Sequence, residues 1–149
     1  MERKGWVDFD YQLDSDEIPR PFISFKLRCL GSSSNIEASG VVDSGAERTL
    51  LIADFAQALD IRLTEITKVP IYGLGDDDKT YGYPATVELL VDGFDEYVEM
   101  NIFFVKDLKV SGLLGQGQFF NQFNVSFDKR NGKTWITKNP SLVFHEEIP

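Results

Sequence analysis

Apolar and polar residues alternate along much of the chain after residue 21, which is the period of strands with one buried face. In the segment Phe22–Cys29 every second residue from position 23 is apolar, and Cys29 belongs to this apolar set as a small core residue. The segments Ile36–Val42, 85–91 and 97–105 are further predicted strands. The pattern therefore predicts a mainly β protein.

Two short stretches depart from this alternation. Apolar residues recur at helical spacing over residues 53–60, which predicts a short amphipathic helix, and residues 119–123 form a second helix-like stretch whose three phenylalanines are expected in the core. Residues 69–83 are rich in glycine and predict a β-hairpin with an acidic tip at residues 76–78. A turn at residues 130–133 predicts a last hairpin.

The length of 149 residues and the apolar content of 42% fit one globular domain. Residues 1–20 are polar and acidic and end beside two prolines, Pro19 and Pro21. We therefore expect residues 1–20 to form a polar N-terminal arm and residues 21–149 to form the single domain.

The net charge of -9 disfavours nucleic acid and anionic membranes, which bind basic surfaces, so neither is expected as a partner. The N-terminus lacks the apolar run of a signal peptide. No segment reaches the length of about 18 apolar residues that spans a membrane. These features together predict a cytoplasmic protein.

Cys29 is the single cysteine and His145 the single histidine, so neither an intrachain disulfide nor a zinc site is expected. A Ser-His or Cys-His hydrolase would depend on His145, and Ser44 lacks the flanking glycine pair of a nucleophile elbow. Three aspartates follow residues 73–75, where they would repel a phosphate, and they lack the ligand spacing of a calcium loop. No metal or cofactor is therefore expected.

The most informative motif lies at the end of the predicted strand Ile36–Val42, where Asp43, Ser44, Gly45 and Ala46 follow directly. A sheet would hold the backbone of Asp43 rigidly while its carboxyl group faces an opening, and Gly45 would let another chain approach closely. Asp, Ser and Gly also favour turns, so the tripeptide alone supports a turn and a chemical site about equally.

Taken with two later segments, this motif resembles that of the retropepsin-like aspartic proteases. Residues 43–46 are similar to the catalytic Asp-Thr/Ser-Gly-Ala motif of that family, and residues 69–83 occupy the place of its flap. Residues 113–115, Leu-Leu-Gly, are similar to its motif of two hydrophobic residues and a glycine. The resemblance covers roughly residues 22–137. It implies a closed β-barrel lobe with a flap hairpin and one or two short helices, as a single retropepsin-like domain over residues 21–149.

The family's mechanism, carried over by this resemblance, uses two facing carboxyl groups that share one proton and activate a water between them. The chain contains a single Asp-Ser-Gly sequence, so the resemblance implies a homodimer with one Asp43 from each copy and an extended peptide or protein as substrate. Ser44 would brace the two motifs across the interface, and Gly45 would contact the substrate main chain. The expected supporting or substrate-binding residues are Ser44, Gly45, Ala46, Gly73, Leu74 and Gly75.

The chain departs from the family after its Leu-Leu-Gly motif. Many relatives have an arginine followed by an acidic residue or asparagine there, whereas this chain has Gln116 and Gly117. The ion pair with which that arginine supports the dimer in some relatives is therefore not expected. The departure keeps a second hypothesis open, namely a non-catalytic dimerisation or peptide-binding module with a retropepsin-like fold.

Overall fold

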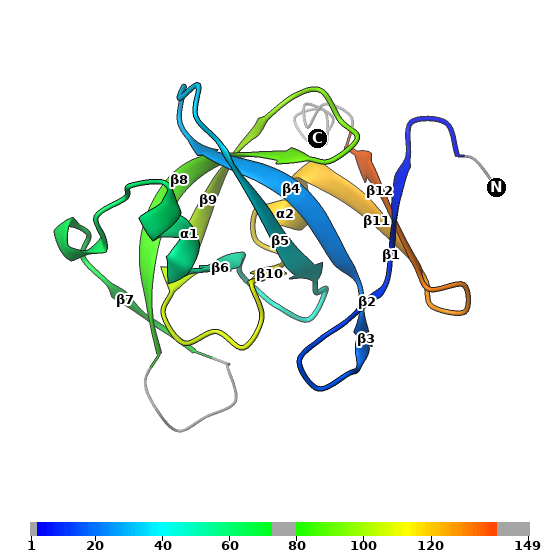
Figure 1. The fold of residues 1–149 in the computed structure, drawn as a ribbon, viewed down its shortest axis with the longest axis horizontal. Helices are drawn as coiled ribbons and strands as arrows, with labels where there is room; N and C mark the ends of the chain where they lie inside the picture. The colour runs from blue at the N-terminus through cyan, green and yellow to red at the C-terminus, as the bar shows by residue number, and fades with distance from the viewer. Residues whose placement is uncertain (1–2, 73–79, 140–149) are drawn as a thin grey trace, which may run out of the picture.

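The computed structural model describes residues 3–72 and 80–139 (Figure 1). Strands dominate the described chain, and its helices are short. In chain order, the elements are β1 (Val7–Asp10), β2 (Gln12–Leu13), β3 (Pro19–Arg20), β4 (Phe22–Cys29), β5 (Ile36–Val42), β6 (Leu50–Ile52), α1 (Ala53–Ala58), the 3₁₀ turn η1 (Leu63–Glu65), β7 (Val69–Ile71), β8 (Thr80–Val91), β9 (Val98–Val105), β10 (Gly112–Leu114), α2 (Phe119–Gln122), β11 (Phe123–Asp128) and β12 (Lys133–Lys138).

The largest sheet is a closed barrel. Its strand order is β4-β5-β10-β6-β9-β8-β7, and β4 also pairs with β8, so the first six strands form a ring and β7 extends it outside the ring. The closing pair is antiparallel, with Phe25 opposite Val91 and Cys29 opposite Val87. This arrangement confirms the predicted mainly β fold with a closed barrel and short helices.

The alternation in the sequence decides which side chains fill the barrel. In β4 the side chains of Ile23, Phe25 and Leu27 are buried while their neighbours are half-exposed. Each such side chain stabilises the fold by about 1.5–3 kcal/mol when it leaves water. Cys29 ends the strand half-buried, so the prediction that it is a core residue is wrong, because it lies beyond the pairing of β4 with β5, which ends at Leu27. The expectation for the phenylalanines is confirmed for Phe119 and Phe123, which are buried.

A second, three-stranded sheet has the order β1-β12-β11 and packs beside the barrel (Figure 1). Strand β1 comes from the segment assigned to the polar arm, and it pairs antiparallel with β12. Lys133 of β12 binds the carboxylates of Asp8 at 2.9 Å and Asp10 at 2.7 Å. Phe119 of α2 stacks on Phe123 of β11, with 4.9 Å between the ring centroids, and both side chains belong to the same core cluster as the buried residues of the barrel.

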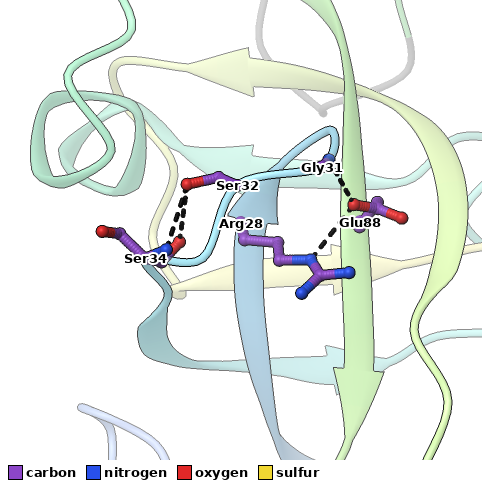
Figure 2. A network of polar contacts seen from close by, with 5 residues as sticks. All are labelled: Arg28, Gly31, Ser32, Ser34 and Glu88. Atoms are coloured by element: carbon purple, nitrogen blue, oxygen red, sulfur yellow. Dashed lines mark hydrogen bonds and ion pairs between the residues drawn. The ribbon is translucent and has the colours of Figure 1, made fainter.

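A polar network ties the two strands that close the barrel (Figure 2). Arg28 and Glu88 are opposite each other in the β4–β8 register, and the Arg28 Nε donates to Glu88 Oε1 at 3.1 Å. The Gly31 N–H donates to the same oxygen at 2.8 Å, and the Arg28 guanidinium lies 3.6 Å from the Tyr97 ring centroid. The pKa of Glu88 lies below its ordinary value, mainly because of the hydrogen bond from the Gly31 N–H and to a smaller extent because of Arg28.

The described residues include no helix that is both long and apolar enough to cross a membrane.

Candidate active site

Asp43 follows β5 at a point where the backbone is held between buried residues. Strand β10 runs parallel to β5, with Leu114 opposite Val42, and the Asp43 N–H donates to the Leu114 carbonyl at 3.0 Å. Val42 and Leu114 are both buried. The position of the Asp43 backbone is therefore fixed by the sheet, as the strand-end pattern predicts.

The carboxylate of Asp43 is held by its own loop. The Gly45 N–H donates to Asp43 Oδ1 at 2.8 Å, and the Ala46 N–H donates to the Asp43 carbonyl at 3.2 Å. The side chain of Asp43 is half-buried, whereas Ser44 and Gly45 are exposed. One carboxylate oxygen is thus engaged by the backbone while the group still reaches the surface, so the loop is a turn and also presents a carboxylate.

The residues that follow β10 brace this loop. The backbone N–H groups of Gln116 and Gly117 donate to the carbonyls of Ala46 at 2.8 Å and Glu47 at 2.7 Å. The side-chain Nε2 of Gln116 donates to the Ser44 carbonyl at 2.9 Å. Gln116 therefore binds the loop of its own chain.

Thr49 joins the two segments from inside, and its role was missed by sequence reasoning. Its side chain is 1% exposed. Its hydroxyl donates to the Gly117 carbonyl at 2.8 Å and accepts the Gly115 N–H at 3.2 Å. The available signal was a threonine directly before the apolar run of β6.

Gly115 is required by close approach of backbones. A Cβ atom at this position would lie 2.4 Å from the Arg48 carbonyl oxygen and 2.6 Å from the Ala46 carbonyl oxygen. Such distances leave no space for a side chain, and a backbone cannot move aside as a flexible side chain can. The glycine of the Leu-Leu-Gly motif therefore allows β10 to pack against the Asp43 loop.

Two cavities meet at Asp43. The first has a volume of about 340 Å³, with an apolar part formed by Leu50, Ile71 and Leu113, and charged residues Glu47 and Arg48 also line it. The second has a volume of about 580 Å³ and shares Asp43 and Leu113 with the first. Asp43 and Leu113 thus lie between two neighbouring cavities, which are together called the cleft below.

The sequence-predicted residues fall into three groups. Asp43, Gly45 and Ala46 line the first cavity, and Ser44 lies exposed in the same loop. Strand β7 pairs with the start of β8, so the stem of the predicted hairpin is present, with Ile71 opposite Thr80. Gly73, Leu74 and Gly75 lie outside the described residues.

Among the residues that are described, no group of three or more metal-ligating side chains is found.

The comparisons with known proteins place the fold. No family model matches the sequence, and neither does any curated protein. Among solved structures, the chain is similar to the crystal structure of a retropepsin-like aspartic protease from Rickettsia conorii, with a TM-score of 0.56. The two chains are 17% identical over 88% of this chain and 90% of that one. This chain therefore has the fold of the retropepsin-like aspartic proteases, which confirms the fold that the resemblance implies.

Proposed function

We propose that the protein is an aspartic endopeptidase that acts as a homodimer, in which two Asp43 carboxyl groups activate a water. The observation that carries this proposal is the position of Asp43 at the centre of the cleft, with its backbone fixed by β10 and its carboxylate held by the Gly45 N–H. The shared fold with a retropepsin-like aspartic protease supports it.

The chemistry needs a second carboxyl group. Two facing carboxyl groups hold one proton between them, since both cannot comfortably ionise at short range. The ionised group takes a proton from the water as its oxygen attacks the peptide carbonyl carbon, and the protonated group gives its proton to the carbonyl oxygen. The sequence has one Asp-Ser-Gly, so the second group comes from another copy across a two-fold axis. In this proposal Ser44, which is exposed, braces that contact.

An extended peptide is the proposed substrate. The apolar residues of the two cavities offer places for its side chains, and the edge position of β7 leaves backbone groups beside the cleft for its main chain. Gly73, Leu74 and Gly75 would cover the peptide from the tip of the β7–β8 hairpin, and this role stays a prediction, as does the cytoplasmic location.

The first experiment measures peptide cleavage by the Asp43→Asn variant. We expect a loss of at least about 100-fold in kcat, because asparagine keeps the shape of the side chain and removes the acid–base group. Asp92→Asn is the matched control, since Asp92 is an exposed aspartate in the turn after β8. Cleavage by the Asp43 variant at the wild-type rate would refute the proposal. Peptide binding by a wild-type dimer that cleaves nothing would support the non-catalytic module instead.

A mixing experiment tests the shared site. If wild type and the Asp43→Asn variant are mixed in equal amounts and exchange freely, about a quarter of the dimers contain two wild-type copies. A site made by two copies therefore predicts about a quarter of the activity of the same total amount of wild type, whereas a monomeric site predicts about half. Sedimentation of each protein alone reports whether dimers are present.

A further inference from the structure

The hairpin formed by β2 and β3 is not held in place by apolar packing. Only two residue pairs form its ladder, Gln12 with Arg20 and Leu13 with Pro19. Leu13 is 63% exposed and Ile18 is 45% exposed. A hairpin this short is at most marginally stable by itself, so its shape depends on other contacts.

Asp14 supplies those contacts. Its Oδ1 accepts the N–H groups of Asp16 at 2.8 Å and Ile18 at 3.0 Å, and its Oδ2 accepts the Arg20 Nε–H at 2.9 Å. The Asp14 side chain is 8% exposed and that of Arg20 is 47% exposed. The pKa of Asp14 lies below its ordinary value, mainly because of the hydrogen bond from the Ile18 N–H and to a smaller extent because of Arg20. The Asp14–Arg20 pair therefore stays charged in mildly acidic solution.

The hairpin lines one of the two cavities that meet at Asp43. Its residues Asp14, Ser15, Asp16 and Arg20 line the cavity of about 580 Å³. The other walls of this cavity are Val41, Asp43, Thr80, Asp107, Leu108, Lys109, Val110 and Leu113. An apolar surface beside the carboxylate is thus faced by an ion pair from the N-terminal segment.

We propose that the β2–β3 hairpin is a wall of the substrate-binding cleft, and that its Asp14–Arg20 pair sets which substrate side chain this cavity accepts. Because the pair is internally neutral, it adds no net charge to a cavity that Asp16, Asp107 and Lys109 also line, and releasing either partner changes which charged side chain the cavity prefers. Asp14 and Arg20 are specificity-determining residues, and the proton transfers belong to Asp43. The inference rests on the proposed peptidase function and adds the charge preference of its substrate.

Two substitutions release one partner of the pair at a time. Arg20→Gln leaves the Asp14 carboxylate uncompensated in a cavity that Asp16 and Asp107 also line, so peptides with lysine in this cavity gain relative to those with glutamate. Asp14→Asn frees the Arg20 guanidinium in the cavity that Lys109 also lines, and this reverses the preference. Since Arg20 is half-exposed and solvent screens its charge, we expect each shift to be about two- to fivefold in the ratio of kcat/KM.

The assay compares peptides that differ only by lysine, glutamine or glutamate at positions flanking the cleaved bond. A two-fold symmetric dimer has this cavity on each side of the bond, so the shifts occur at equivalent positions on both sides. Asp8→Asn is the control: it weakens an ion pair of similar length with Lys133 in the same N-terminal segment, at residues that do not line this cavity. Its peptide preference is expected to equal that of wild type.

Opposite shifts for the two variants support the proposal. Unchanged ratios in both variants, or shifts of the same sign, overturn it. A binding measurement keeps the test separate from catalysis. The affinities of the same peptides are measured for the Asp43→Asn protein, with and without each hairpin substitution. If the hairpin lines the binding site, each substitution shifts these affinities in the same direction as it shifts the ratios of kcat/KM. If wild type cleaves no peptide, the peptidase proposal fails, and an unchanged order of affinities would then overturn the hairpin proposal as well.

Discussion

Two buried threonines give opposite expectations for the same substitution. Thr49 and Thr134 are the buried polar residues of the described chain, at 1% and 0% exposure. The hydroxyl of Thr49 bonds with Gly115 and Gly117, whereas that of Thr134 has no hydrogen-bond partner among the described residues. Replacing either by valine keeps the shape of the side chain and removes only the hydroxyl.

The expected magnitudes follow from these partners. Thr49→Val leaves the buried Gly115 N–H and the Gly117 carbonyl without their partner, and each lost bond of this kind costs about 1–3 kcal/mol. We therefore expect the free energy of unfolding to fall by roughly 2–5 kcal/mol. Thr134→Val removes an unpaired buried hydroxyl, so we expect no loss or a gain of about 1 kcal/mol.

Urea unfolding at neutral pH measures both values, because a change of midpoint with an unchanged slope reports stability directly. Thr49→Ser retains the hydroxyl and should recover most of the stability. Cleavage by the Thr49→Val variant, measured where it is still folded, should have a lower kcat, since the hydroxyl aligns the loop that carries Asp43 with β10. Equal losses of stability in the two valine variants would refute the hydrogen-bond argument.

Two further changes test the packing of β10 against the Asp43 loop and the pairing of β4 with β8 that closes the barrel. Gly115→Ala brings a methyl group to within 2.4 Å of the Arg48 carbonyl. We therefore expect the free energy of unfolding to fall by about 3 kcal/mol and peptide cleavage to be lower. Wild-type stability in urea would contradict the packing described. The pKa of Glu88 is lowered, so its carboxylate stabilises the fold above its ordinary pKa of 4.5 and this contribution is lost as pH falls below that value. Glu88→Gln should therefore lower Tm most near neutral pH, with a difference from wild type that shrinks below pH 4.5, and a difference that does not depend on pH would rule this out.

Strand positions could be predicted where one face of a strand is buried. The bounds Phe22–Cys29 and Ile36–Val42 follow directly from alternation with a period of two, because a shift of one residue would turn every apolar side chain outward. The pairing of β4 with β8, which closes the barrel, could not be read in this way. It joins segments about sixty positions apart, and no local pattern records which strands meet.

The polar N-terminal segment shows a second limit. Val7 and Phe9 alternate with Asp8 and Asp10, which is a strand pattern, but the surrounding charge favoured an arm. In the structure this segment pairs with β12, its residues Val7 and Phe9 pack against the core, and Lys133 of β12 binds both aspartates. A cation 123 to 125 positions away is invisible to a reading of the segment alone.

The candidate site was only partly predictable for a similar reason. Asp43 and its loop carry a short motif that is visible in any single sequence. Thr49 and Gln116 act through hydrogen bonds to backbone atoms, which leave no characteristic residue pattern on the partner. Asp14 and Arg20 reach the cleft only because β2 and β3 turn back toward it.

The position of β10 between β5 and β6 bears on when the protein becomes competent during its synthesis. The loop that carries Asp43 is completed by Gly115 and Gln116, which are added to the chain 66 and 72 residues after Thr49 and Ser44. A growing chain that has not yet reached these residues holds the Asp-Ser-Gly sequence without the backbone partners that order it. Under the proposed peptidase function, the order of translation thus delays activity until the last strand of the barrel has been made.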